Sequence, residues 1–287
     1  MFAGEHASLN AISSVVPSLC PRSLAHGKLE GKDAYFLATE FLELGSRQRG
    51  SGSKGSGMSL AQKLAKLHNT PAPIPEGYEE PLFGFPVTTC CGDTPQDNGW
   101  NSSWADFFTN NRLLAIMVRG ERLQGADSQL RELVKRTAKE VVPRLLGDGH
   151  LGGAAGIKPV VVHGDLWSGN HGRGRFAGRF SKHHESDQQP EIEETEDAVE
   201  DVVFDPSSCY AHSEYELGIM QMFGGFGDSF MREYHKLVPM TEPVEEYDGR
   251  VKLYECYHHL NHWSIFGGGY RGGAVRILEG LLRKYGK

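Results

Sequence analysis

Residues 160–170 read VVVHGDLWSGN, and this stretch decides how we interpret the chain. The three valines are typical of a short buried strand, which would deliver His163, Gly164 and Asp165 at its end. Asn170 follows Asp165 by five positions. One loop can therefore present a proton acceptor and an amide oxygen side by side.

A second apolar run at 202–204 ends in Asp205, which stands before a proline. Mg²⁺ prefers hard oxygen ligands, few of them from protein and the rest from phosphate and water. A separate carboxylate must orient the attacking hydroxyl and take its proton. Asp165 is thus the candidate base, and Asn170 and Asp205 are the candidate magnesium ligands. The Asp-x-x-x-x-Asn spacing is also that of the protein-kinase catalytic loop, so the pattern predicts phosphoryl transfer.

Each half of this pattern also has a structural interpretation. A His-x-Asp sequence on a strand often only holds a loop, and an Asp before Pro is often a turn former. The order and spacing of both halves, each after an apolar strand, favour the phosphotransferase interpretation. We interpret His163 itself as a structural residue that holds the loop.

Outward from these strand ends, the apolar spacing predicts a mostly helical chain. The predicted helices cover 2–16, 58–69, 103–118, 127–146, 214–223, 250–264 and 272–285, and the predicted strands cover 34–42, 160–162 and 202–204. This outline predicts an α+β fold in which a small mixed lobe is joined to a mostly helical lobe.

Two segments of biased composition divide the chain. Residues 45–57 (GSRQRGSGSKGSG) predict a flexible linker between an N-terminal part, 1–44, and a C-terminal part, 58–287. We predict an acidic surface insertion at residues 177–199, because residues 185–201 hold nine acids and no bases, and these like charges repel one another. The linker contains a literal G-x-G-x-x-G, but no second strand follows it, so we attribute this match to composition.

Composition excludes several classes of protein. The 287 residues carry a net charge of −7 with 39% hydrophobic residues, which is typical of a globular chain and argues against a nucleic-acid binder. No apolar run is long enough to span a membrane. The five cysteines are odd in number and form no CxxC pairs. We therefore expect a cytoplasmic monomer without nucleic-acid or membrane partners.

Two pairs of residues resemble metal ligands without completing a site. His258 and His262 lie one helical turn apart, but the glutamate of an H-E-x-x-H site is absent. Cys90 and Cys91 have no second cysteine pair with which to bind zinc. We expect neither pair to bind a metal ion.

The segments HGDLWSGN and FDPSSCYAHSEYELGIMQMFGGF resemble the fructosamine-3-kinase / ketosamine-3-kinase (protein-ribulosamine 3-kinase) family. Further matching stretches are MFAGEHASLNAI, YFLATEFLEL, LAKLH, FGFPVTTCCGDTPQDNGWNSSWADFF and YHHLNHWSIFGGGYRGGAVRIL. The resemblance covers nearly the whole chain outside 45–57 and 177–199. It implies the two-lobe protein-kinase-like fold that aminoglycoside phosphotransferases and choline kinases share.

The resemblance also implies residue roles. Asp165 would be the catalytic base, and Asn170 and Asp205 would hold Mg²⁺. Glu5 would be the glutamate that pairs with an ATP-anchoring lysine. Residues 40–42 (Glu40, Phe41 and Leu42) would form the hinge whose backbone meets the adenine of ATP. The implied substrate is a ketosamine on a protein or small amine, phosphorylated on its sugar 3-hydroxyl to give an unstable product that frees the amine.

Trp167, two positions past Asp165, has two interpretations that stay open. Its broad indole face suits a sugar or its linker, and it equally suits packing of the loop against a helix.

One part of the family pattern is absent from this sequence. The Gly-rich loop and the ATP-anchoring lysine precede the glutamate in the family, whereas Lys28 and Lys32 follow Glu5 here. We therefore expect an incomplete N-terminal lobe, as in an N-terminally truncated or a degenerate member, and weak or absent activity. The alternatives are a kinase of the aminoglycoside or choline type and a non-catalytic ligand-binding protein.

Overall fold

The computed structural model describes residues 1–45, 57–177 and 199–287. The predicted linker at 45–57 and the predicted acidic insertion at 177–199 therefore lie, apart from their end residues, outside the described residues. No helix in the described ranges is both long enough and apolar enough to cross a bilayer.

Helices dominate the described part of the chain, as predicted. Their bounds are α1 Phe2–Val15, α2 Leu60–Asn69, α3 Trp104–Phe107, α4 Ala115–Gln124, α5 Ser128–Arg136, α6 Val142–Leu146, α7 Glu216–Phe223, α8 Asp228–Leu237, α9 Tyr247–Phe266 and α10 Arg271–Tyr285. Seven-residue and five-residue π-helical stretches, Phe108–Leu114 and Thr137–Val141, join α3 to α4 and α5 to α6. The sequence did not predict α8.

The strands are short and form small antiparallel sheets. Their bounds are β1 Ser23–Lys28, β2 Tyr35–Thr39, β3 Leu42–Leu44, β4 Thr89–Cys91, β5 Thr94–Gln96, β6 Val160–Val162, β7 His171–Phe176, β8 Glu200–Val203 and β9 Cys209–Ala211. Their sheets are β1-β2, β3-β7-β8, β4-β5 and β6-β9. The predicted strands at 160–162 and 202–204 correspond to β6 and β8.

The predicted single strand at 34–42 is wrong. The chain forms β2 with β1, leaves the sheet at Glu40, and forms β3 with β7 in a different sheet. The backbone N–H and the guanidinium of Arg22 both donate to the Glu40 carboxylate, at 2.9 and 2.8 Å. High β-propensity marks all these residues as strand formers, but it does not specify which partner each half will find.

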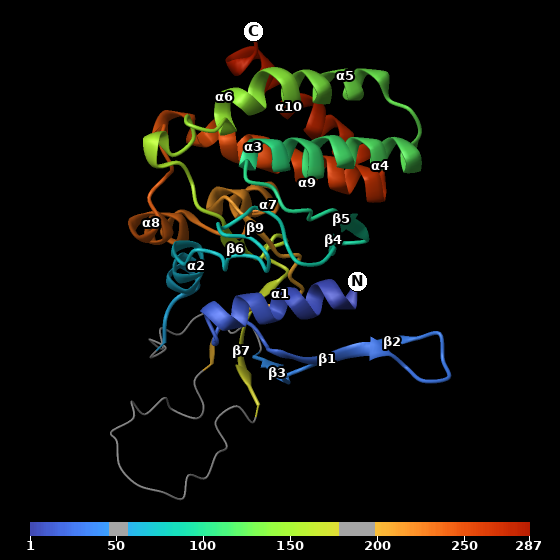
Figure 1. Cartoon of the computed structure of the whole chain (residues 1–287), viewed down its shortest axis with the longest axis vertical. Helices are drawn as coiled ribbons and strands as arrows, with labels where there is room; N and C mark the ends of the chain where they lie inside the picture. The colour runs from blue at the N-terminus through green and yellow to red at the C-terminus, as the bar shows by residue number, and fades with distance from the viewer. Residues whose placement is uncertain (46–56, 178–198) are drawn as a thin grey trace, which may run out of the picture.

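The three-stranded sheet joins the two parts of the chain that the linker separates. Leu42 in β3 lies opposite Phe176 in β7, and β7 pairs on its other side with β8. The short N-terminal part therefore does not form a sheet of its own around β3. Figure 1 shows α1 lying between these strands and the helices of the C-terminal part.

Helix α9 forms the centre of the helical part (Figure 1). It packs against α4, α7 and α10, and Leu253, Tyr254 and Leu260 on it are fully buried. A Cβ atom added to Gly120 in α4 would come within 2.1 Å of the Trp263 ring, so only glycine allows α4 to approach α9 this closely. The site described below lies where the chain leaves β6 and β8.

Candidate active site

The loops that follow β6 and β8 are tied to each other by backbone hydrogen bonds. The Ser207 N–H donates to the His163 carbonyl at 2.8 Å, and the Phe204 N–H donates to the Asn170 carbonyl at 3.1 Å. The buried His163 ring lies 3.0 Å from the Phe204 carbonyl through Nε2, which agrees with the structural role predicted for it. These bonds hold Asp165 and Asp205 at one end of the β6-β9 sheet.

Gly164 allows the two loops to approach each other. Its φ is +81°, in the left-handed region, and an added Cβ would lie 2.1 Å from the Ser207 carbonyl oxygen. Asp205 also has a positive φ, of 57°, and is the only described residue other than glycine that does. Such a conformation persists only where the surroundings fix it, and it is common at functional sites.

Glu216, at the start of α7, anchors the backbone of the Asp165 loop. Its buried carboxylate accepts the backbone N–H groups of His163 and Gly164 at 2.5 and 3.0 Å. Burial alone would raise the pKa of Glu216, but His68 and His163 hold it below its usual value. Sequence reasoning missed this residue; the available signal was a glutamate that opens an otherwise apolar helix, ELGIMQMF.

A cavity of about 340 Å³ brings the predicted site residues together. Its lining includes Glu5, Cys90, Asp165, Trp167, Asn170 and Asp205. Residues from α1 and from the loops that follow β6 and β8 thus face one space. The predicted hinge, residues 40–42, is not part of this lining. Phe41 is 68% exposed. The Glu40 N–H donates to the Arg22 carbonyl, and the Phe41 carbonyl accepts the Ala177 N–H.

Three carboxyl groups, those of Glu5, Asp165 and Asp205, line the cavity. Burial raises the pKa of Asp165 to about 7, and the charges of Glu216 and Asp205 contribute to the rise. Burial and the charge of Asp205 raise the pKa of Glu5 as well, against the opposing charge of the N-terminal ammonium group. Among the described residues, no Lys or Arg side chain forms an ion pair with Glu5, Asp165 or Asp205. Such a cavity favours a bound cation.

The side-chain oxygens in this cavity fit a magnesium ion that is held mainly by phosphate. The Asn170 side-chain nitrogen donates to the Asp165 carbonyl at 2.9 Å, so the amide oxygen is the atom left for a ligand. The described residues contain no group of three or more His, Cys, Asp or Glu side chains that could hold a metal ion by themselves. Two protein oxygens from Asn170 and Asp205, completed by phosphate and water, match the usual coordination of Mg²⁺.

A buried thiol contacts the candidate base. Cys91 Sγ lies 3.7 Å from Asp165 Oδ1, and the Asn261 amide nitrogen donates to the Cys91 carbonyl at 3.2 Å and lies 3.3 Å from its sulfur. Burial and the Asp165 carboxylate raise the pKa of the Cys91 thiol well above its usual value. The thiol therefore stays protonated, and its S–H group donates a hydrogen bond to Asp165. Sequence reasoning considered Cys91 only as a zinc ligand and missed this contact.

A second cavity, of about 480 Å³, is also lined by Asp165. Asp165 and Trp167 line both cavities, while the second one has a largely aromatic wall. Its aromatic side chains are Trp167, Phe223, His262, Phe266 and Tyr270. The Trp167 and Phe223 ring centroids lie 5.6 Å apart, and those of Phe223 and His262 lie 5.0 Å apart. Trp167 thus both faces a cavity and packs against α7, so both of its interpretations keep structural support.

Comparisons with known proteins match nearly the whole chain. The family model for fructosamine kinase matches residues 1–284. The chain belongs to the fructosamine kinase family. It is therefore a phosphotransferase that acts on a hydroxyl group, as predicted, and a kinase family implies ATP as the co-substrate.

Two curated relatives show how far the similarity extends. Ketosamine-3-kinase of Mus musculus is 33% identical over 295 residues, which cover 99% of this chain and 84% of the relative. The chloroplastic protein-ribulosamine 3-kinase of Arabidopsis thaliana is 31% identical over 283 residues, covering 99% of this chain and 72% of the relative. The family predicted from HGDLWSGN is confirmed.

Solved structures share the fold. A crystal structure described as a fructosamine-3-kinase from Thermobifida fusca superimposes with a TM-score of 0.71 at 22% identity, covering 99% of this chain and 80% of that one. A second, from Haemophilus somnus, gives a TM-score of 0.70 at 21% identity, with 98% and 79% covered. The family fold and its α+β class agree with the prediction.

Proposed function

We propose that this chain transfers the γ-phosphoryl group of ATP to the sugar 3-hydroxyl of ketosamines, ribulosamine or fructosamine, on protein or small amines. The observation that carries this proposal is that Asp165 faces two cavities of different chemistry. The acidic cavity suits Mg²⁺ and phosphates, and the aromatic cavity suits the apolar face of a sugar. A hydroxyl between them would contact the Asp165 carboxylate.

The residues would act as follows. Mg²⁺, when bound by Asn170 and Asp205, would neutralise charge on the transferred phosphoryl group. Asp165 would orient the 3-hydroxyl and accept its proton as the new O–P bond forms and the bond between the γ-phosphorus and the bridging oxygen breaks, releasing ADP. Glu216 and Cys91 would hold Asp165 in place. Breakdown of the 3-phosphate would then free the amine, which is deglycation.

Glu5 bears on how fast the chain works. In the family, a lysine that pairs with this glutamate anchors the ATP phosphates, yet none of the described lysines pairs with Glu5. Losing a phosphate clamp removes several tenfold steps of rate, each worth about 1.4 kcal/mol. We infer that transfer is slow unless a cation from elsewhere reaches Glu5. A kcat typical of the family, measured while no cation pairs with Glu5, would contradict this inference.

The proposal is tested by following label from γ-labelled ATP to four acceptors at equal concentration. These are blocked fructosyl-lysine, blocked ribulosyl-lysine, an aminoglycoside and choline. We expect label only in the ketosamines, at the 3-position by phosphorus NMR, and only with Mg²⁺. Label in the aminoglycoside or in choline would instead support the alternative acceptor class; the aromatic wall, which suits quaternary ammonium groups, makes choline the sharper control.

A protein that binds ligands without turnover would behave differently. It would show a melting shift with ATP and Mg²⁺ but no label in any acceptor. The same preparation should therefore be examined by both measurements. Absence of label beside a clear melting shift would contradict the proposed function.

A further inference from the structure

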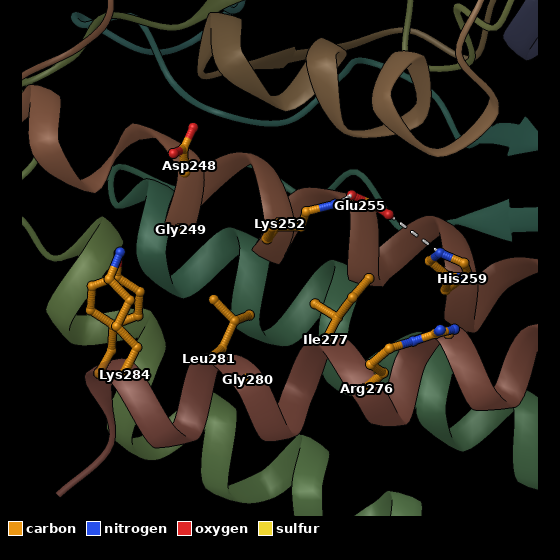
Figure 2. Close-up of a pocket in the computed structure, with 12 residues that line it drawn as sticks. Asp248, Gly249, Lys252, Glu255, His259, Arg276, Ile277, Gly280, Leu281 and Lys284 are labelled. Atoms are coloured by element: carbon orange, nitrogen blue, oxygen red, sulfur yellow. Dashed lines mark hydrogen bonds and ion pairs between the residues drawn. The ribbon is translucent and has the colours of Figure 1, made fainter.

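A third cavity, of about 480 Å³, lies between α9 and α10 (Figure 2). Its floor is apolar and includes Ile277 and Leu281. None of the residues assigned to the magnesium ion, the nucleotide or the catalytic base lines it. The volume is in the range of specific ligand sites.

This cavity continues the aromatic cavity along one face of α9. Its α9 residues include 248, 252, 255 and 259, and those of the aromatic cavity include 262 and 266. The spacing runs 4, 3, 4, 3, 4, which places all six positions on one side of a helix. His259 and His262 are three residues apart, about 4.5 Å along the axis. The two cavities are therefore neighbours.

Tyr270 contacts residues of both cavities. Its ring centroid lies 5.0 Å from that of His262, in the aromatic cavity, and 6.5 Å from that of His259, in the third cavity. Tyr270 therefore lies beside residues of both cavities. We call the third cavity the α9–α10 groove.

The two walls of the groove differ in charge. On α9, Glu255 is held by Lys252 at 2.5 Å and by His259 at 3.5 Å, as the dashed lines in Figure 2 show. On α10, the charged lining residues are Arg276 and Lys284, both exposed. In the described ranges neither cation has an acidic partner at ion-pair distance, although Lys284 Nζ lies 4.9 Å from the Tyr285 ring centroid and Tyr285, together with the charges of Asp248 and Glu246, raises its pKa. The α10 wall therefore offers positive charge to a ligand.

The positions of these two cations set the shape of a partner. Arg276 lies toward the His259 end and Lys284 toward the Asp248 end (Figure 2). They are eight residues apart on a helix, or about 12 Å along the axis. An extended peptide covers this distance in about four residues. Ile277 and Leu281 lie between them and suit an apolar side chain.

We propose that the α9–α10 groove binds the polypeptide that carries the ketosamine, with a preference for acidic residues about three to four positions apart next to the modified lysine. This inference rests on the proposed function. A ketosamine on a lysine sits at the end of a long side chain, so its backbone would lie outside the aromatic cavity. The groove is the adjacent surface whose charge and length fit that backbone.

Glycated peptides of different charge test this inference. Each carries one fructosyl-lysine, flanked by acidic, neutral or basic residues, and blocked fructosyl-lysine serves as the small acceptor. We expect kcat/KM to be about tenfold higher for the acidic peptide than for the basic one, as expected for two exposed ion pairs. The double variant Arg276→Glu, Lys284→Glu should reverse this order and leave kcat/KM for the small acceptor unchanged.

A matched control separates the groove from net charge. The double variant Lys236→Glu, Arg283→Glu makes the same change in charge at exposed positions that do not line the groove. It should keep the preference of the unmodified protein. Equal kcat/KM for all peptides, or the same reversal in the control variant, would overturn the inference.

Binding gives a readout that does not depend on turnover. Fluorescence anisotropy with a labelled, unglycated acidic peptide should show saturable binding that the Arg276→Glu, Lys284→Glu variant loses and the control keeps. If no ketosamine is phosphorylated but this binding pattern holds, the proposed function fails and the groove stands. If the small ketosamine is phosphorylated but no peptide binds, the groove inference fails alone.

Discussion

The Asp165 loop and residues 40–42 both connect short strands, but they are held in different ways. Backbone N–H groups of the Asp165 loop donate to the fully buried carboxylate of Glu216, and Cys91 contacts Asp165 from a buried position. At residues 40–42, Glu40 pairs with Arg22, and the Arg22 side chain is 57% exposed while that of Glu40 is 10% exposed. Buried polar contacts are costly to break and exposed ones are not, so changes at the two places should differ in size.

The largest effect should come from Asp165→Asn. An amide cannot accept the hydroxyl proton, so we expect kcat for a ketosamine to fall about 10³-fold, within the range for removal of a general base. Single-turnover transfer from labelled ATP measures this. The ATP-dependent melting shift should remain, which shows that the fold and nucleotide binding survive. A loss smaller than tenfold would mean that Asp165 is not the base.

Gly164→Ala should have the next largest effect, on stability. An added Cβ would clash with the Ser207 carbonyl at a φ of +81°. We expect the free energy of unfolding to fall by about 3 kcal/mol, from the backbone conformation together with the clash. The matched control is Gly31→Ala in the β1-β2 turn, where φ is +70° but no atom lies within 4 Å of the new Cβ. Urea unfolding should show a loss of only about 1 kcal/mol there; equal losses would remove the distinction between the two regions.

The sequence predicted the chemistry better than the pairing of the strands. VVVHGD and VVFD contain their own signals, because an apolar run with an acid within three residues of its end can be recognised without any distant residue. β7 and β9 carry no such signal: His171–Phe176 contains two glycines and two arginines, and it becomes a strand only between β3 and β8. Pairing between distant segments is decided by tertiary contacts that local propensity does not contain.

The supporting residues of the site were missed for the same reason. Glu216 is 51 residues from Asp165 in the sequence, and Cys91 is 74 residues away. Both act through one contact that exists only after folding. Helix α8 is a different case, because Gly227 followed by Asp228, and Phe230 four residues before Tyr234, gave a usable local signal.

The pH dependence of activity should report the burial of the Asp165 loop. Burial raises the pKa of Asp165 to about 7. The base is the deprotonated form, so kcat/KM should be constant above this pH and fall tenfold per unit below it. More Mg²⁺ should move the fall to lower pH, because a nearby cation favours the carboxylate. A profile that stays flat down to pH 5 at low Mg²⁺ would show that Asp165 is better solvated than the structure indicates.

Cys91 tests whether the buried contact itself matters for the reaction. Cys91→Ala removes the S–H donor to Asp165, and we expect kcat to fall about tenfold with little change in KM, since one hydrogen bond to a charged group is lost. Cys91→Ser keeps a donor and should recover most of the rate. Cys256→Ala, another fully buried cysteine, controls for loss of packing. If Ala and Ser variants lose kcat equally, the thiol serves packing alone.

The smallest effect should come from Arg22→Gln at the other region. The exposed guanidinium contributes little to stability, so the free energy of unfolding should fall by less than about 1 kcal/mol. Because the pair fixes Glu40, the KM for ATP should rise about two- to threefold, at constant kcat, if the backbone of residues 40–42 binds adenine. Lys28→Gln, which breaks the exposed pair with Asp33 at the tip of the same hairpin, should change neither quantity. An unchanged KM for ATP in Arg22→Gln would place the adenine away from residues 40–42. These residues would then have only a structural role at the surface, and the Asp165 loop alone would bear on the reaction.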